Sequence, residues 1–202
     1  MVPVDVHAPR PVTGRTLLHE GMVWDVVRDA IDLGEAGTVR REYVRHPGAV
    51  AVLALDDQER VLLLRQYRHP VGRELWEPPA GLLDVEGEDL VVAAARELAE
   101  EADLVAGSWW HLLDYFTTPG GSDECIRLFV ARELTLVPEA LRHVREAEER
   151  GIVPEWVPID EAVAAVLGGE LGNPSTVVGV LALAAARARG WSDLEAVELP
   201  QP

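Results

Sequence analysis

Residues 84–103 constrain the fold most, because they combine an apolar stripe with a dense run of acids. Apolar side chains recur there at helical spacing, at Leu90, Val91, Ala94, Ala95 and Leu98. This periodicity predicts an amphipathic helix over residues 89–103 that packs against a core. The same stretch holds eight acids and one base, a net charge of −7. A compact fold needs something to compensate this repulsion.

Three glutamates lie on one side of the expected helix. Glu97 and Glu101 are four residues apart and therefore share a face, with Glu100 beside them. Like charges so placed destabilise a helix unless a cation lies between them. Mg²⁺ binds carboxylate oxygens and fills its remaining positions with water and substrate phosphate. The spacing favours a divalent-metal site, and the alternative is a solvated acidic surface.

The rest of the chain predicts more strands than helices. Strand-like runs bounded by turn residues lie at 22–46 (a hairpin), 49–55, 60–67, 109–116 and 125–131. Two further helices are expected, one over 160–167 and one with Asn173 as its N-cap and Pro174 as its first residue. Residues 139–149 fit either a helix or a loop, and residues 1–14 read as a loose terminus. This order predicts an α+β fold with a mixed sheet.

Composition excludes several classes of function. The 202 residues are 48% hydrophobic, which suits a globular domain with a full core. Every one of the 18 basic residues is an arginine, and 35 acids bring the net charge to −17. Such a charge argues against nonspecific binding to nucleic acid or anionic lipid. An anionic substrate needs local help from arginine or a metal.

The single cysteine favours a reducing compartment. Cys125 has no second cysteine to pair with, and no Cys/His cluster has zinc spacing. Residues 1–14 lack the basic and then apolar order of a signal peptide, and the most apolar segment, 177–186, is too short to span a bilayer. We therefore expect a cytoplasmic protein.

The acidic segment also carries a recognisable pattern. From Ala80 the chain reads AGLLDVEGE, followed by seven residues and then by RELAEE at 96–101. This stretch resembles the Nudix box of hydrolases that cleave nucleoside diphosphates linked to another moiety. Two positions depart from the family pattern. Six residues rather than five separate Gly81 from Glu88, and Asp103 stands where a glycine is usual, at a turn that asks for positive φ.

The resemblance implies a metal centre with assigned residues. Glu97, Glu101 and the carbonyl of Ala80 would bind Mg²⁺, or alternatively Mn²⁺, and Glu100 would be a further ligand or a hydrogen-bond partner. Arg96 would orient the carboxylates through charge-assisted hydrogen bonds. Glu88 would stabilise the loop or the start of the helix.

Segments outside the box resemble one subfamily, the ADP-ribose pyrophosphatases. They include QYRH at 66–69, LWEPPAG at 75–81 and PGGSDE at 119–124, and a proline at the position of Pro119 is a mark of that subfamily. The resemblance implies hydrolysis of ADP-ribose to AMP and ribose 5-phosphate. The substrate-binding residues that it implies are Arg41, Glu42, Arg68, Glu77, Pro119, Ser122 and Asp123.

The same resemblance places the general base on a loop beyond the box. Glu146, Glu148 and Glu149 are the acids available there, and Glu149 matches the family pattern best. His143 is the other candidate, because the unperturbed pKa of histidine suits proton transfer.

The resemblance also implies an architecture. We expect a Nudix-like α/β/α sandwich with a mixed sheet over residues 47–195. A small N-terminal β-sheet region over 1–46 would mediate a homodimer and help to build the adenosine site of the partner subunit. Two alternatives stay open: a diphosphatase for another nucleotide sugar such as GDP-mannose or for a dinucleotide, and a sensor that binds ADP-ribose without cleaving it. Sensors of that kind generally lose the box glutamates, which are intact here.

Overall fold

The computed structural model describes residues 2–145 and 151–200, which form two compact units. Unit 1 comprises Met1–Pro47 and Phe116–Glu124, and unit 2 comprises Gly48–Tyr115 and Cys125–Pro202. Each is described by itself below.

The strands are β1 (Val12–His19), β2 (Asp25–Asp32), β3 (Thr38–Arg45), β4 (Ala49–Ala54), β5 (Arg60–Arg68), β6 (Arg73–Glu77), β7 (Ala80–Leu82), β8 (Leu104–Phe116), β9 (Cys125–Leu136), β10 (Val153–Pro158) and β11 (Glu195–Val197). The α-helices are α1 (Leu90–Ala102), α2 (Ile159–Leu167) and α3 (Pro174–Ala188). Short 3₁₀ turns are η1 (Gly34–Ala36), η2 (His69–Val71) and η3 (Glu139–Leu141).

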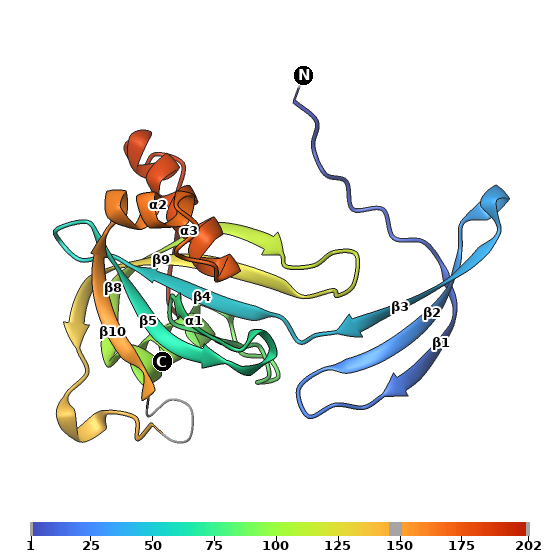
Figure 1. The fold of residues 1–202 in the computed structure, drawn as a ribbon, viewed down its shortest axis with the longest axis horizontal. Helices are drawn as coiled ribbons and strands as arrows, with labels where there is room; N and C mark the ends of the chain where they lie inside the picture. The colour runs from blue at the N-terminus through green and yellow to red at the C-terminus, as the bar shows by residue number, and fades with distance from the viewer. Residues whose placement is uncertain (1, 146–150, 201–202) are drawn as a thin grey trace. The chain divides into compact units, whose positions relative to one another are not determined.

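Unit 1 is built on an antiparallel sheet in the order β1-β2-β3, drawn in blue in Figure 1. The expected hairpin corresponds to β2 and β3, whereas β1 was not predicted and begins inside the segment that read as a loose terminus. All eight residues of β1 are exposed, so its sequence has no buried face to show as alternation. Pairing across the sheet holds it instead, notably a two-pronged contact of Arg15 with buried Asp29 at 2.7 Å.

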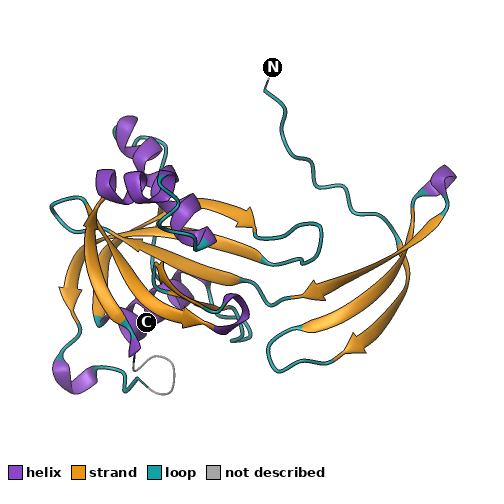
Figure 2. Ribbon diagram, in the orientation of Figure 1, coloured by secondary structure: helices purple, strands orange, loops and turns teal. Residues whose placement is uncertain are grey.

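The loop between β8 and β9 completes unit 1, since its backbone bonds to the end of β3 (Figure 2). The N–H of Val44 donates to Gly121 at 2.9 Å, and the carbonyl of Val44 accepts from Asp123 at 3.2 Å. The carboxylate of Asp123 also accepts from the N–H of His46 at 2.8 Å. These bonds fix a turn-rich loop that contains Pro119 and two glycines.

Unit 2 contains two sheets, one in the order β11-β8-β9-β4-β7 and the other in the order β10-β5-β6. Strand β4 pairs with β9 in parallel and with β7 antiparallel, so the larger sheet is mixed. Every residue of β4 is buried, which accounts for a continuous apolar run rather than an alternating one.

The core of unit 2 lies on both faces of β4. Val50, Val52 and Ala54 pack in one cluster with the apolar side of α1. The alternate residues Ala51 and Leu53 pack in a second cluster with buried residues of α2 and α3. Figure 1 shows α2 and α3 on one side of this strand and α1 on the other. The expected α+β class, with a mixed sheet between helices, is confirmed.

Within the described ranges, no helix has the length and apolar character that crossing a membrane requires.

Candidate active site

Helix α1 forms the base of the site, and both of its ends are explained by single aspartates. Asp89 is the N-cap, and its side chain accepts from the N–H of Val91 at 3.0 Å. At the other end Asp103 adopts a left-handed conformation with φ of 55° and ψ of 33°. This is the backbone that the usual glycine would take, and aspartate tolerates it better than most residues. The helix therefore ends within one residue of the predicted boundary.

Arg96 is the hub of a carboxylate network on the exposed side of α1. Its guanidinium binds Glu88 with two bonds, at 3.0 and 3.2 Å, and donates from Nη1 to Glu97 at 2.5 Å. Glu100 lies 3.4 Å from the same Nη1. The Arg96 guanidinium holds the pKa of Glu88 below its usual range. Arg96 therefore ties the loop before the helix to the carboxylates on it.

Glu97 lies directly against the backbone of Gly81. A Cβ built on Gly81 would lie 2.0 Å from the Glu97 carboxylate, so any larger residue would displace that side chain. Burial raises the pKa of Glu97, and the neighbouring Arg96 opposes the rise. Glycine at the start of the motif therefore allows the Glu97 side chain to approach the backbone closely.

Glu101 reaches β7 from the last turn of α1. Its Oε2 accepts from the N–H of Ala80 at 2.9 Å. Burial raises the pKa of Glu101 to about 7, with the Ala80 N–H partly offsetting the rise. The ionised side chain is thus incompletely compensated by the protein around it.

The residues fit a hard divalent cation, although protein side chains alone do not enclose one. Within residues 2–145 and 151–200, no group of three or more His, Cys, Asp or Glu side chains gathers in a metal-binding arrangement. Glu97 and Glu101 are two partly buried carboxylates whose raised pKa values call for positive charge. Mg²⁺ usually takes only one or two carboxylates and keeps water and phosphate oxygens in its other positions. That donor set matches two glutamates with a nearby backbone carbonyl.

A second network in unit 2 fixes Arg68 at the end of β5. Its guanidinium forms two bonds with Glu77, at 2.9 and 3.0 Å, and Glu77 is only 5% exposed. The side-chain amide of Asn173 donates to Glu77 at 2.8 Å. Both oxygens of Glu77 are thereby bonded within the protein. The sequence identified Asn173 only as an N-cap, which is confirmed, and its second bond to Glu77 was missed.

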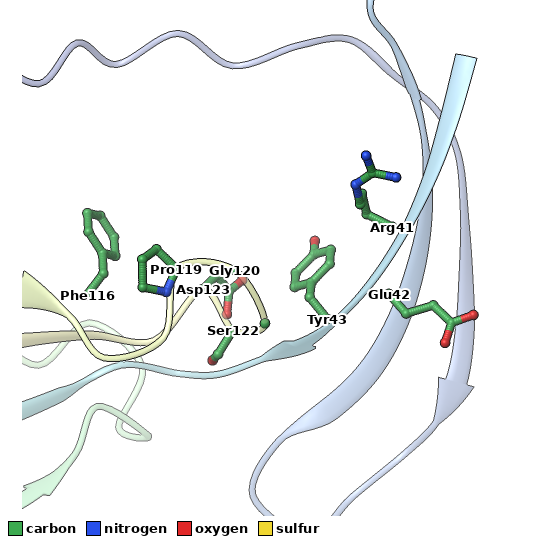
Figure 3. Close-up of a pocket in the computed structure, with 9 residues that line it drawn as sticks. Arg41, Glu42, Tyr43, Phe116, Pro119, Gly120, Ser122 and Asp123 are labelled. Atoms are coloured by element: carbon green, nitrogen blue, oxygen red, sulfur yellow. The ribbon is translucent and has the colours of Figure 1, made fainter.

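Unit 1 contains a separate cavity of about 490 Å³ between the end of β3 and the β8–β9 loop (Figure 3). Five of the predicted substrate-binding residues line it, namely Arg41, Glu42, Pro119, Ser122 and Asp123. Figure 3 shows Arg41 and Tyr43 on one side of β3 and the Glu42 side chain directed away from them. The Glu42 carboxylate accepts a hydrogen bond from Arg28 at 2.8 Å.

Tyr43 and Phe116 also line this cavity and were missed by the sequence reasoning. The Tyr43 hydroxyl donates to Asp29 at 3.1 Å and accepts from Arg15 at 3.0 Å, which fixes the ring. Burial raises the pKa of the Tyr43 hydroxyl. Alternation along β3 was the available signal, because it places Tyr43 on the same face as Arg41.

The predicted general base Glu149 and its alternatives Glu146 and Glu148 lie outside the described residues. His143, the other candidate, is exposed in the segment that follows η3.

The chain is similar to several known proteins. The model of the NUDIX domain family matches residues 44–175. An ADP-ribose pyrophosphatase of Mycobacterium tuberculosis is 45% identical over 82% of this chain and 79% of its own length. An ADP-ribose pyrophosphatase of Bacillus subtilis is 33% identical over 81% of this chain and 86% of its own length. A crystal structure described as an ADP compounds hydrolase superposes with a TM-score of 0.70 at 20% identity, covering 94% of this chain and 99% of that one.

Proposed function

The chain belongs to the NUDIX family, and from that premise we propose that it hydrolyses the diphosphate of ADP-ribose to AMP and ribose 5-phosphate. The observation that carries the proposal is the 45% identity to an ADP-ribose pyrophosphatase over most of both chains. The intact carboxylates of α1 support hydrolysis rather than binding alone. The enzyme is a Nudix hydrolase.

The metal requirement follows from the carboxylate pair. A divalent ion, proposed to be Mg²⁺ with Mn²⁺ as the alternative, supplies neutralisation of phosphate charge and polarisation of water when it is bound. Glu97, Glu101 and the Ala80 carbonyl are the proposed ligands. Arg96 holds Glu97 and Glu100 through the bonds described above, and Glu100 contributes either as a ligand or as a hydrogen-bond acceptor.

The chemical step is attack of water on one phosphorus of the diphosphate. A new P–O bond forms, the bridging P–O bond breaks, and the water proton passes to a base. Glu149 is the proposed base. Electrostatic stabilisation of the departing phosphate is the contribution expected of cationic side chains.

Two sets of residues are proposed to bind the substrate. Arg68 carries the charge that suits a diphosphate, and buried Glu77 holds its guanidinium in a fixed orientation. In unit 1 the cavity lined by Arg41, Pro119, Ser122 and Asp123 offers hydrogen-bonding groups beside two aromatic rings, which suits a nucleoside. Glu42, at the rim of this cavity, is proposed to contribute to substrate binding, with its carboxylate held by Arg28.

Assembly and location are proposed on separate grounds. The strands of residues 1–46 are proposed as a dimerisation region and residues 47–195 as the catalytic domain, because unit 1 exposes several large apolar side chains. The lone Cys125 supports a cytoplasmic location.

The test is formation of AMP and ribose 5-phosphate from ADP-ribose with Mg²⁺, for the wild type and for Glu97→Gln and Glu101→Gln. Both substitutions should lower kcat by roughly 100-fold or more, because each removes a charged ligand while preserving shape. Glu139→Gln is the matched control, since Glu139 is exposed on η3 and the change in charge is the same.

A parallel panel with GDP-mannose and a dinucleotide tests the substrate assignment. Faster cleavage of either compound than of ADP-ribose would contradict the proposal. Binding of ADP-ribose without cleavage under Mg²⁺ or Mn²⁺ would instead identify a sensor.

A further inference from the structure

The carboxyl end of α1 carries the wrong charge for a helix terminus. Its last turn contains Glu100 and Glu101 and no basic residue. The last carbonyls of a helix lack partners within the helix and carry partial negative charge, which favours cations there. This turn also holds a proposed metal ligand, so its geometry matters for function. The N–H of Asp103 bonds to the carbonyls of Leu98 and Ala99, which leaves the carbonyls of the residues after them for groups elsewhere in the chain.

Arg145 supplies such a group from a distant part of the chain. Its Nε donates to the backbone carbonyl of Glu100 at 3.2 Å. Its Nη2 donates to the carboxylate of Asp103 at 2.7 Å. The side chains of Arg145 and Asp103 are 27% and 19% exposed, so the ion pair is largely shielded from solvent. One guanidinium therefore caps the last turn of α1 and is itself held by the residue that ends the helix.

The backbone of Asp103 also bonds to the chain that follows β9 and leads to Arg145. Its carbonyl accepts from the N–H of Val137, just after β9, at 2.8 Å. The left-handed conformation of Asp103 needs no carboxylate, since glycine adopts it more readily. The carboxylate is therefore explained by its ion pairs, with Arg145 at 2.7 Å and with Arg142 at 4.0 Å, rather than by the turn.

We propose that Asp103 and Arg145 act together as positioning residues for the metal-binding turn of α1. Their contact holds the Glu100 carbonyl and so fixes the backbone from which Glu100 and Glu101 project. The proposal rests on the metal role of Glu101 in the proposed function. It assigns no contact with substrate or metal to either residue.

Substitution of Arg145 separates this proposal from a simple charge effect. Removing a cation near a metal site should strengthen binding of a divalent ion if only long-range electrostatics mattered. Loss of positioning should weaken it. The two explanations therefore predict opposite changes in divalent-ion affinity for Arg145→Gln. For Asp103→Asn both predict a lower affinity.

The experiment measures binding of Mn²⁺ alone to the full chain by isothermal titration calorimetry, without substrate. Arg145→Gln and Asp103→Asn should each weaken binding by roughly 10-fold, and the double variant by little more than either single change. Arg189→Gln is the control, since it removes the same charge from an exposed ion pair with Asp193. Unchanged or tighter binding in Arg145→Gln would overturn the proposal.

Asp103→Gly removes the carboxylate while favouring the backbone conformation, so it guards against a folding defect. It should also weaken Mn²⁺ binding by roughly 10-fold, and wild-type affinity in this variant would overturn the proposal. Urea unfolding of each variant identifies a purely structural role, in which stability falls while Mn²⁺ affinity is unchanged. If ADP-ribose proves not to be a substrate, these binding measurements still decide the positioning role.

Discussion

Glu101, a proposed metal ligand, opposes folding of the metal-free protein. Burial raises its pKa from 4.5 to about 7 in the metal-free protein. The unfolded chain releases this proton near pH 4.5, so between the two values the folded state holds more protons. The stability of the metal-free protein therefore falls as pH rises across that window, and the penalty is complete above about pH 7.

Replacing Glu101 with glutamine should remove this penalty. At pH 8 in EDTA, Glu101→Gln should be more stable than the wild type by on the order of 3 kcal/mol, a figure that a shift of this size implies. At pH 4.5 the two proteins should unfold alike. Urea denaturation at both pH values makes the comparison, with exposed Glu139→Gln as the control. Equal stabilities of wild type and Glu101→Gln at pH 8 would contradict the argument.

At the scale of elements, the sequence predicted those that bury at least one face. Helix α1 and the start of α3 were predicted because apolar spacing and an Asn-Pro start are local signals. Strand β1 was not predicted, since none of its residues is buried. Its Arg15 contacts Asp29, which lies 14 residues further along the chain. Long-range pairs of this kind leave no local pattern.

The same limit applies within the site. The spacing of Glu97, Glu100 and Glu101 is local and could be read from the sequence. The contact between Asn173 and Glu77 joins residues 96 apart, and that between Arg145 and Asp103 joins residues 42 apart. Neither could be predicted without the tertiary fold.

Asn173 links two elements, which leads to a prediction about stability. Its Oδ1 caps α3 by accepting from the N–H of Thr176 at 3.1 Å, while its amide donates to Glu77. Asn173→Ala removes both bonds and should lower the free energy of unfolding by about 2–4 kcal/mol, as the sum of a lost cap and a buried acceptor left short of a partner.

Asn173→Asp provides the sharper comparison by urea denaturation at pH 8. It keeps the capping oxygen but directs a second carboxylate at Glu77, so it should be at least as destabilising as alanine. Asn173→Ser keeps the cap without adding charge and should cost less than either. A fully stable Asn173→Asp would show that the bond to Glu77 contributes little.

At the scale of the whole molecule, net charge is divided unevenly between the two units. Unit 1 carries six arginines and nine acids, a net charge of −3, while unit 2 carries the remaining −14. Unit 1 nevertheless exposes a run of large apolar side chains at the end of β1 and in the β1–β2 turn, namely Leu17, Leu18, Met22, Val23 and Trp24. A nearly neutral surface with exposed apolar groups favours association, whereas a strongly charged one resists it.

We therefore expect the β1–β2 turn to mediate the proposed homodimer. The wild type should sediment at twice the mass of the chain, and the double variant Met22→Ser with Trp24→Ser should shift toward monomer at low micromolar concentration, because it removes two exposed apolar anchors. Val105→Ser with Leu136→Ser is the control, since it removes two exposed apolar side chains from β8 and β9 of unit 2. A wild type that sediments as a monomer at every concentration would refute the dimer, and a control variant that dissociates equally would place the interface on unit 2.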